Sequence, residues 1–439
     1  MLQNKKSWGR TALSSTQDRV LNVFFAVTVI GTFLALLGIV LYYIFAFAAQ
    51  SLGSHAFDWL LGIFSDFVAI MSASISGSPY LQDGASYPPF AIAILYPFAW
   101  LCRTSLADYA GASLSVDELT ARMVCRPQFW ISYILFFLLC TSLVLFAVLK
   151  RYRPGAIPSL KLCGVTVLSA PFVYAVMRGN VIYFALIFLL FFLLWHEHKN
   201  AVLRELSYFS LALAGMIKIY PLFFGVFLLH KRRWFASCRV AIYFALGTFL
   251  SFFLYRDGLD NFGPFLKQLG SFMNEGERLL SERNLSLPST LFKLFYNVLP
   301  AHVLPSFFRY ASLAVFLSVF AVATITASYT KSTFSRSVIA ASVVVLLPSI
   351  SYFYVLIFML IPFFEFLKSY DMNSPKNRCF YTVLFLFLFL APTILAANFL
   401  IHALIVLLML SVEIRNVFKK EILPALAAKK EQRKNGALR

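Results

Sequence analysis

Long, uninterrupted runs of apolar residues alternate with short polar segments along almost the whole chain. The first run extends from Val20 to Ala49, and similar runs recur as far as residue 418. A helix needs about 20 apolar residues to cross a bilayer, and most of these runs approach that length. Because the runs are continuous rather than alternating apolar with polar, they favour helices over membrane strands. The pattern therefore predicts an all-α polytopic membrane protein.

We expect a bundle of about twelve transmembrane helices. The first run is predicted to be a retained helix, because it is long for a signal peptide and lacks a convincing cleavage site. Some of the later runs are short, and merged or broken helices are expected there. The predicted spans are residues 20–49, 128–150, 160–178, 180–197, 201–217, 219–231, 235–255, 308–328, 337–350, 351–368, 379–398 and 401–418.

Lys and Arg are concentrated in polar segments that can all lie on one face of this bundle. By the positive-inside rule, that face is cytoplasmic, and so are both termini. The transmembrane domain then covers residues 20–418, with large outer loops at 51–127 and 256–306. The basic segments are the N-terminal tail 1–19, the turns 150–161, 199–204, 231–233, 331–336 and 368–378, and the C-terminal tail 419–439.

The composition supports this interpretation and changes the meaning of the net charge. The chain has 439 residues, of which 60% are hydrophobic, and its mean hydropathy is +0.78. Soluble domains do not have such a composition. The net charge of +19 is therefore interpreted as a topology signal, and no nucleic-acid partner is expected.

Two segments of the first outer loop are predicted to form interfacial helices. Tyr87 to Cys102 is apolar but short and begins with two prolines in its first three residues. Treating it as a span would move the basic turns 150–161 and 231–233 to the outside, so we expect it to lie at the membrane surface. Phe57 to Ile75 is predicted to be a short amphipathic helix that carries Asp58 and Asp66.

Cysteine spacing gives no metal pattern. Cys102 and Cys125 both fall in the first outer loop, where either a disulfide or two free thiols would fit. No phosphate-loop, dinucleotide or zinc motif is visible. We therefore expect neither a metal nor a cofactor.

Asp66 is the strongest candidate for chemistry. A carboxylate just outside a membrane helix can act as a general base on a hydroxyl group, within reach of a lipid-borne substrate. It can also be a metal ligand, although no convincing second ligand is visible, or simply a solvated charge or helix cap. Asp58 lies eight positions earlier, roughly on the same helix face, and is a candidate for substrate binding.

Two cations are exceptions to the positive-inside rule, because they fall on the predicted outer side of the bundle. Arg178 in Arg178-Gly179-Asn180 and Lys218 in Lys218-Ile219-Tyr220-Pro221 fall at predicted outer turns between spans. Such charges are costly near a membrane and tend to mark a site. The guanidinium of an arginine can donate two parallel hydrogen bonds to a phosphate group, and the ammonium of a lysine offers it a compact positive charge. The alternative is that they extend to the outer lipid headgroups.

The second outer loop contains the polar stretch Asn284-Leu285-Ser286-Leu287-Pro288-Ser289. Asn284 and Ser286 are candidates for lining an acceptor site, and a loop cap without a direct role is the alternative. Tyr352 follows the turn 348–351 and is expected to border the same cavity.

Taken together, these motifs resemble glycosyltransferase family 87, a family of membrane enzymes of the GT-C superfamily. The resemblance rests on Asp66-Phe67, the segments Gly77–Tyr80 and Tyr87–Pro89, Arg178–Asn180 with Lys218–Pro221, and the stretch 284–289. It covers roughly residues 60–370. Many members of the family carry Gly-Gln-x-Asn where this chain has Arg178-Gly179-Asn180, so that position departs from the family pattern.

The resemblance implies an inverting transfer of a monosaccharide, mannose or arabinofuranose in known members, from a polyprenyl-phosphate donor. The acceptor would be a lipid or glycan on the non-cytoplasmic face, and the enzyme would reside in the inner, or plasma, membrane. It implies that Asp66 is the base and that Lys218 and Arg178 occupy the positions of the family's lysine and arginine, where we expect them to stabilise the departing phosphate. Tyr87, Asn180 and Tyr220 lie in the same motifs and are candidates for substrate binding.

Two other classes of protein remain as alternatives. A lipid or glycan transporter or flippase would place ionisable residues near the middle of the membrane and would show a repeat; here these residues cluster at span ends. An O-antigen polymerase or ligase would be expected to have an Arg-rich outer loop late in the chain.

Overall fold

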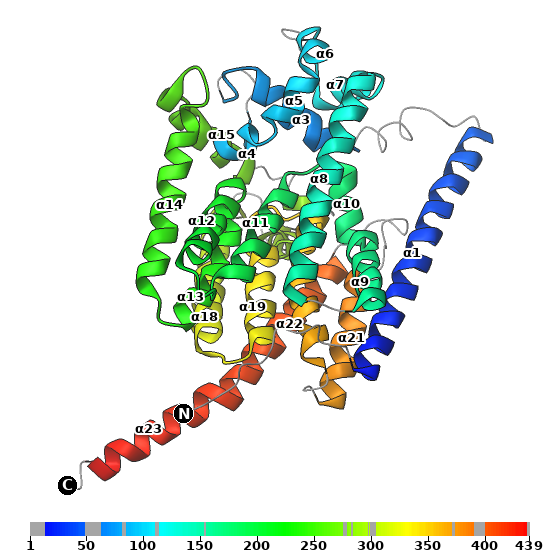
Figure 1. Ribbon diagram of the computed structural model, residues 1–439. Helices are drawn as coiled ribbons and strands as arrows, with labels where there is room; N and C mark the ends of the chain where they lie inside the picture. Colours follow the sequence, from blue (N-terminus) through cyan, green and yellow to red (C-terminus); the bar gives the residue numbers. More distant parts are fainter. Residues whose placement is uncertain are drawn as a thin grey trace.

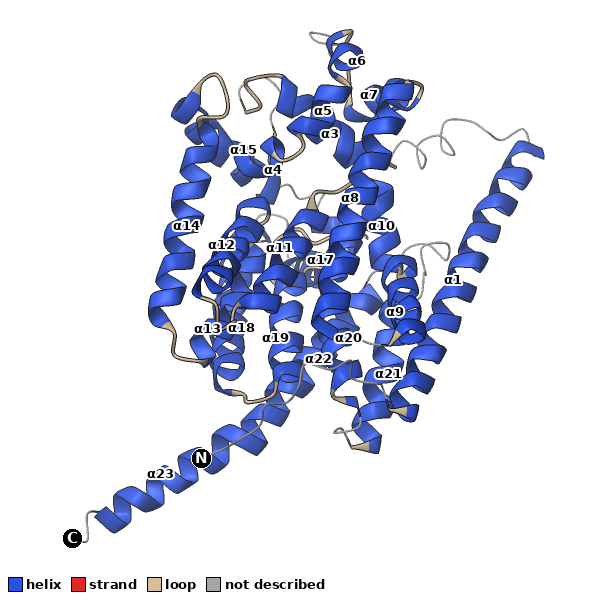
Figure 2. Cartoon of the chain, in the orientation of Figure 1, coloured by secondary structure: helices blue, strands red, loops and turns tan. Residues whose placement is uncertain are grey.

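The computed structural model describes a chain that is helical throughout its described parts. These parts are residues 14–48, 63–80, 85–109, 114–152, 155–274, 279–281, 284–296, 298, 304–370, 374–389 and 400–436. They contain no β-strand, and a single isolated bridge pairs Asn284 with Tyr352. Figures 1 and 2 show a bundle of upright helices capped at one end by short helices. The all-α prediction is confirmed.

Within the described parts of the chain, five helices are long and apolar enough to cross a membrane. A sixth span results if the bent pair α9 (Ala156–Leu168) and α10 (Ala170–Arg178) counts as one. The five are Ser15–Leu34 of α1 (Ser15–Ala48), α8 (Pro127–Tyr152), α14 (Trp234–Phe252), Tyr310–Tyr329 of α18 (Leu304–Tyr329), and Leu400–Ala428, which joins α22 (Leu400–Val417), the π-helix η6 (Phe418–Ile422) and the first part of α23 (Leu423–Gly436).

The remaining predicted spans correspond to shorter helices in the described parts of the chain. As described, these do not reach the length of about 20 residues that a span needs, so the count of about twelve stays a prediction. They are α11 (Ile182–Trp195), α12 (Ala201–Ile217), η1 (Tyr220–Gly225) with α13 (Val226–His230), α19 (Thr333–Leu346), η3 (Phe353–Met359) with α20 (Leu360–Lys368), and α21 (Pro375–Phe389).

Helices α11 and α19 are buried on nearly all sides. An apolar helix without a polar face belongs at the centre of a bundle. Helix α11 packs against α12 and α8, and α19 packs against α20 and α22. The packing of α11 and α19 sets the positions of the neighbouring helices. The candidate site lies at the capped end of these helices.

The sequence predicts a span over 160–178, and the structure divides this region into the two helices α9 and α10. The helix breaks at Ser169, whose backbone is extended (ψ 138°), and the two halves meet at an angle of 53°. Pro171 lies in the first turn of α10, where it has no need of a hydrogen-bonded N–H. The predicted spans 219–231 and 351–368 likewise begin as the 3₁₀ segments η1 and η3.

The short helices of the first outer loop differ in extent from the predicted ones. Residues 57–62 lie outside the described part, and α3 (Ser65–Ile75) begins only after Phe64. The segment 87–102 forms two helices rather than one, α4 (Pro89–Ala93) and α5 (Tyr96–Leu101), and most of α3 is buried under them. Helices α6 (Arg103–Ala107) and α7 (Val116–Val124) follow, and the second outer loop contains η2 (Gly258–Asn261), α15 (Phe262–Asn274) and α17 (Leu287–Tyr296).

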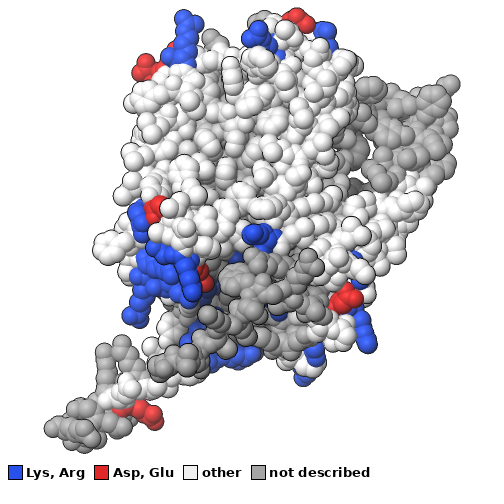
Figure 3. Space-filling view, in the orientation of Figure 1, with Lys and Arg blue, Asp and Glu red and all other residues white. Residues whose placement is uncertain are grey.

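Charged side chains gather at the two ends of the molecule and leave a broad uncharged belt between them. Figure 3 shows this belt, with Lys and Arg dominating at the end where the C-terminal helix emerges. Such a belt is typical of a protein embedded in a bilayer. Cys102 is buried and Cys125 exposed, and both are free thiols, so no disulfide joins them.

Candidate functional site

The candidate site lies where the capping helices meet the bundle. Helix α3, the loop before α4, the turn after α10, the turn between α12 and η1, and the beginning of η3 all contribute side chains to it. Figure 1 shows α3 and α4 at the capped end of the molecule, above α11 and α12. Each contributing segment is a helix end or a short connection, where side chains are free to converge.

Asp66 is held by three hydrogen bonds from the turn that follows α10. Arg178 donates from Nη2 to Oδ1 at 2.6 Å and from Nε to Oδ2 at 3.1 Å, which is a two-point fork. Asn180 donates from Nδ2 to Oδ2 at 2.7 Å. The side chain of Asp66 is 14% exposed, and it lies in the first turn of α3, where the helix dipole favours a negative charge. The carboxylate is fixed in orientation and keeps a lone pair for one more partner.

Gly179 allows α3 to pack directly on this turn. Its φ of +62° is left-handed, which suits the residue that ends helix α10. A Cβ atom at this position would lie 2.5 Å from the Cβ of Phe67. The glycine between Arg178 and Asn180 therefore lets both neighbours reach Asp66.

Phe64, just before α3, is held in a conformation that is rare for a bulky residue. Its φ is +66°. The Phe64 N–H donates to the carbonyl of Met177 at 2.7 Å. Its ring makes edge-on contacts with three aromatic side chains of α8, those of Phe129, Trp130 and Tyr133. Strain of this kind persists only where the surroundings determine it, and here they join the start of α3 to the end of α10.

Asn180 connects Asp66 to Tyr87. Its Oδ1 accepts the N–H of Ile182 at 2.9 Å, which fixes the amide orientation at the start of α11. Its Nδ2 then points to Asp66 and lies 3.4 Å from the hydroxyl of Tyr87. Burial and the nearby Asp66 charge raise the pKa of Tyr87 well above its usual range. Tyr87 is therefore a neutral phenol at any working pH.

The backbone of the segment Tyr87–Pro89 is held in place by two other tyrosines, Tyr80 and Tyr255. The buried Tyr80 donates its hydroxyl proton to the carbonyl of Tyr87 at 2.8 Å. Tyr255, three residues past the end of α14, donates to the carbonyl of Pro89 at 2.7 Å. These two bonds thus hold the backbone from which the Tyr87 ring extends into the site.

Lys218 is a partly buried cation without a counter-ion in the described part of the chain. It caps the C-terminal end of α12 with an extended backbone, and its Nζ lies 4.2 Å from the centre of the Tyr87 ring. Among the described residues, Nζ makes no hydrogen bond and no ion pair. Burial lowers the pKa of Lys218 to about 8, and the negative charge of Asp66 opposes that shift. The arrangement leaves a positive charge available for an anion.

Three further tyrosines surround these groups. Tyr220, at the start of η1, lies within electrostatic range of Tyr87. Tyr354 interacts electrostatically with both Asp66 and Arg178, and its ring stacks against Tyr174 with centroids 6.5 Å apart. No local motif in the sequence singles out Tyr174 or Tyr354. The run of aromatic residues after the turn 348–351 was the only signal for Tyr354.

Asn284 and Ser286 lie apart from this cluster and bind the turn before η3. Asn284 donates from Nδ2 to the carbonyl of Ser349 at 3.1 Å, and its Oδ1 accepts the N–H of Ser351 at 3.0 Å. The Ser286 hydroxyl donates to the same Ser349 carbonyl at 2.8 Å. Both residues are almost fully buried. These hydrogen bonds hold the second outer loop next to Tyr352. The ring centroids of Tyr352 and Tyr354 are 6.0 Å apart.

Two further predictions concern Asp58 and a metal site. Asp58 lies outside the described residues. Within the described ranges, no group of three or more His, Cys, Asp or Glu side chains could hold a metal ion.

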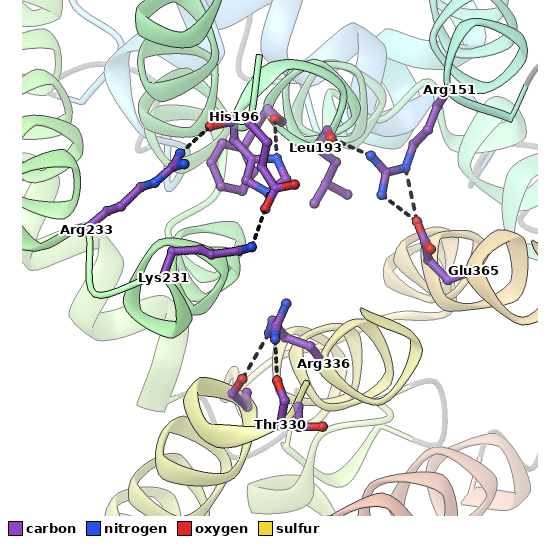
Figure 4. A network of polar contacts seen from close by, with 11 residues as sticks. Arg151, Leu193, His196, Lys231, Arg233, Thr330, Arg336 and Glu365 are labelled. Atoms are coloured by element: carbon purple, nitrogen blue, oxygen red, sulfur yellow. Dashed lines mark hydrogen bonds and ion pairs between the residues drawn. The ribbon is translucent and has the colours of Figure 1, made fainter. Parts of the chain in front are cut away.

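A second polar cluster occupies the other end of the bundle (Figure 4). Arg151 binds Glu365 and the carbonyl of Leu193, which joins α8, α20 and α11. In the same view Arg233 donates to the carbonyl of His196 at 2.9 Å. Arg151 lies roughly 30 Å along α8 from the residues that contact α3. This network connects helix ends at the basic face and is separate from the site around Asp66.

Comparison with known protein families identifies a match. The model of glycosyltransferase family 87 matches residues 86–351, which is more than half of the chain. No curated protein sequence and no solved structure matches. Asp66 lies before the matched segment, and the hydrogen bonds from Arg178 and Asn180 tie it to that segment.

Proposed function

Because the chain belongs to glycosyltransferase family 87, and is therefore a membrane glycosyltransferase, we propose that it takes its sugar from a polyprenyl-phosphate monosaccharide. The acceptor would be a lipid or glycan hydroxyl, and the reaction would invert the anomeric configuration. The observation that carries this proposal is the ammonium group of Lys218, which has no counter-ion among the described residues and lies beside a fixed carboxylate.

A donor phosphate fits the position of Lys218. Its ammonium is a point charge at the end of α12, held against the face of the Tyr87 ring. A phosphate that binds there would supply the missing negative charge. As the sugar departs, the leaving phosphate gains charge, and a nearby cation stabilises that charge in the transition state.

Asp66 supplies the base in this proposal. The acceptor oxygen attacks the anomeric carbon and gives its proton to Asp66, while the bond from that carbon to the phosphate oxygen breaks and its electron pair leaves with the polyprenyl phosphate. A single displacement of this kind inverts the configuration. The site holds the two amphiphiles together, which makes their reaction effectively intramolecular.

The contacts of Arg178 refine its expected role. The sequence leads us to expect that Arg178 stabilises the departing phosphate, but its Nε and Nη2 are engaged with Asp66. We therefore assign Arg178, together with Asn180, to holding the carboxylate of Asp66 in a fixed position and orientation. Lys218 takes the phosphate, and Tyr87, Tyr220 and Tyr354 offer ring surfaces on which a sugar can lie.

The proposed orientation follows from charge. The site lies at the end of the bundle opposite the basic end, so by the positive-inside rule it faces the non-cytoplasmic side. We propose that the protein resides in the inner, or plasma, membrane with both termini in the cytoplasm.

One assay separates this proposal from a transporter or flippase. Purified protein in detergent, with no second compartment and no gradient, receives a panel of polyprenyl-phosphate monosaccharides with a total lipid extract as acceptor. Mass spectrometry then follows donor loss and product gain. Donor consumption is the expected result and identifies the sugar. A folded protein that consumes no donor in any combination would contradict the proposal.

A further inference from the structure

The last described helix, α23, leaves the bundle at its basic end. The π-helix η6 and α23 continue α22 without interruption from Leu400 to Gly436. Figure 1 shows α23 slanting away from the upright helices. Because about 20 residues cross the hydrocarbon core, a span that begins at Leu400 reaches the membrane surface near Lys419. Helix α23 therefore starts close to that surface.

The junction between α22 and α23 is fixed to the body of the protein. The carboxylate of Glu421 accepts hydrogen bonds from the hydroxyl of Thr330 and from the N–H of Lys331, both at 2.9 Å. The buried Arg336 donates to the carbonyls of Ala327 and Thr330 at the same turn (Figure 4). The turn between α18 and α19 thus holds η6 in place and sets the direction in which α23 leaves.

A π turn separates the face that α22 buries from the face that α23 exposes. The N–H of Leu423 donates to the carbonyl of Phe418, five residues earlier. A π turn holds more residues than an α turn, so the helix presents a different face after it. Before the turn, side chains such as Val406 are fully buried in the bundle. After it, Leu423 and Leu426 are 47% and 57% exposed, so the described part of the protein leaves them largely uncovered.

The sequence of α23 places cations on the same helix face as these two leucines. At 3.6 residues per turn, positions 423, 426, 430, 433 and 434 fall within about a third of the helix circumference. Two of these positions hold leucine and three hold Lys or Arg, and the acidic residue of α23, at position 431, lies outside this face. We call this face the basic stripe; it consists of Leu423, Leu426, Lys430, Arg433 and Lys434.

The basic stripe matches the surface of an anionic membrane. Leucines at the start of a surface helix can enter the boundary between headgroups and acyl chains, and Lys and Arg attract anionic headgroups. Nucleic acid would satisfy the cations but not the leucines. Because the stripe begins where the chain leaves the bilayer, lipid is also the partner nearest to it.

We propose that α23 lies on the membrane surface at the basic end of the bundle and binds anionic phospholipids through the basic stripe. The contact adds a lipid-dependent anchor to the orientation that the basic turns establish. It does not depend on the proposed transfer reaction, because the residues of the stripe are separate from the site around Asp66.

Spin labels on the two faces of α23 test this contact in the full-length protein. Leu426→Cys carries a nitroxide in the basic stripe, and Ala428→Cys carries one on the opposite face; both positions are exposed. In the background protein the exposed Cys125, Cys238 and Cys379 are replaced by serine, and its residual signal is subtracted. Each protein is reconstituted in nanodiscs of phosphatidylcholine alone or of an equimolar mixture with phosphatidylglycerol.

The measurement is the accessibility of each label to a water-soluble nickel relaxation agent. In the anionic nanodiscs we expect the label at position 426 to be protected and the label at position 428 to stay accessible. In phosphatidylcholine alone the difference should be lost, because the cations have no anionic partner. Equal accessibility of the two labels in anionic nanodiscs overturns the proposal. So does equal protection in both lipids, which would assign the contact to the leucines alone, or dipolar coupling between labels, which would assign it to a second copy.

Matched charge variants of the Leu426→Cys protein separate the stripe from the general basic charge of this end. One variant combines Lys430→Gln, Arg433→Gln and Lys434→Gln. The control removes the same charge at exposed positions elsewhere, with Arg19→Gln, Lys199→Gln and Lys376→Gln. Each cation near an anionic surface strengthens binding roughly fivefold, so losing three should weaken it on the order of a hundredfold.

We therefore expect the first charge variant to lose the protection at position 426 and the control to keep it. All six changes are at surface positions or on α23, and a thermal melt verifies that both proteins are folded. Equal protection of the two folded variants would contradict the role of the basic stripe.

Discussion

Asp66 and Lys218 carry opposite charges within one site, and their different partners suggest different chemical roles. Asp66 has three hydrogen-bond donors and a fixed orientation. Lys218 has an aromatic face beside it and no counter-ion in the described chain. A base must be fixed with respect to the proton that it accepts, whereas a cation that binds phosphate must be free until the phosphate arrives. The surroundings of each residue match these requirements.

The lowered pKa of Lys218 predicts a pH dependence. Below its pKa of about 8 the ammonium is charged and binds phosphate, and above it the charge is lost. We expect kcat/KM, which reports the free enzyme, to fall as the pH rises through 8. In kcat the fall should come at higher pH, because bound phosphate stabilises the ammonium. Initial rates at varied donor concentration on either side of this pH provide the measurement.

Two variants of Lys218 distinguish a binding charge from a structural one. Lys218→Arg keeps its charge at all accessible pH values, so the fall in kcat/KM should disappear. Lys218→Met should be slow and independent of pH over the same interval. An unchanged pH profile in a folded Lys218→Met protein would assign the titration to another group.

Arg178→Lys tests the fork on Asp66. An ammonium cannot make the two parallel bonds of a guanidinium, so the carboxylate should lose its fixed orientation. We expect kcat to fall by about tenfold to a hundredfold with little change in the donor KM. Arg126→Lys, which alters an exposed pair with Asp108, is the matched control and should retain full activity. A rise in KM alone would return Arg178 to phosphate binding.

At the scale of elements, the site depends on how closely α3 packs on the end of α10. Phe64 and Gly179 both have left-handed backbones, and each lies at the contact between these two helices. Neither feature serves the stability of its own helix alone. Together they bring the first turn of α3 to the donors of Arg178 and Asn180.

Gly179→Ala should therefore harm both stability and activity. The added Cβ has no room beside Phe67, and the φ of +62° is strained for alanine. We expect a loss of about 1–3 kcal/mol in the free energy of unfolding and a larger relative loss of transfer. Gly270→Ala in α15, where a Cβ meets nothing within 4 Å, should be neutral or stabilise by about 0.5–1 kcal/mol. Thermal unfolding in detergent compares the two, and equal melting temperatures would contradict the packing argument.

Local patterns in the sequence predict the helices better than their breaks. Continuous apolar runs predict the bundle because burial of helices requires them. The start of α3, however, depends on a hydrogen bond from Phe64 to Met177, and such a contact between distant segments leaves no local pattern. For the same reason the sequence identifies Arg178 as a cation near a turn but not its partner, and it misses Tyr354 on η3.

At the scale of the whole molecule, the site and the basic network occupy opposite ends. The Asp66 cluster lies under the capping helices, and the Arg151–Glu365 pair lies near the other end of α8. The uncharged belt separates them (Figure 3). This arrangement suits an enzyme that acts on one face of a membrane while its basic face fixes the orientation.

Two native cysteines test that orientation. Cys125, at the end of α7, and Cys379, in α21, are both exposed, and Figure 1 shows α7 and α21 at opposite ends of the molecule. In intact cells, a membrane-impermeant maleimide should label a variant that keeps only Cys125. It should label a variant that keeps only Cys379 after permeabilisation alone. The reverse pattern would place the site on the cytoplasmic face.

The most direct test of the proposed mechanism compares Asp66→Asn with Asp108→Asn. The first change removes the base and retains the shape of the side chain. The second removes an exposed carboxylate that pairs with Arg126 on the same end of the protein. Both purified proteins, with matched thermal melts, are given the donor that the wild type consumes, and product formation is followed by mass spectrometry. We predict that Asp66→Asn loses about 10²- to 10⁴-fold in transfer rate while Asp108→Asn stays at the wild-type rate. Wild-type transfer by a folded Asp66→Asn protein would contradict the assignment of Asp66 as the base.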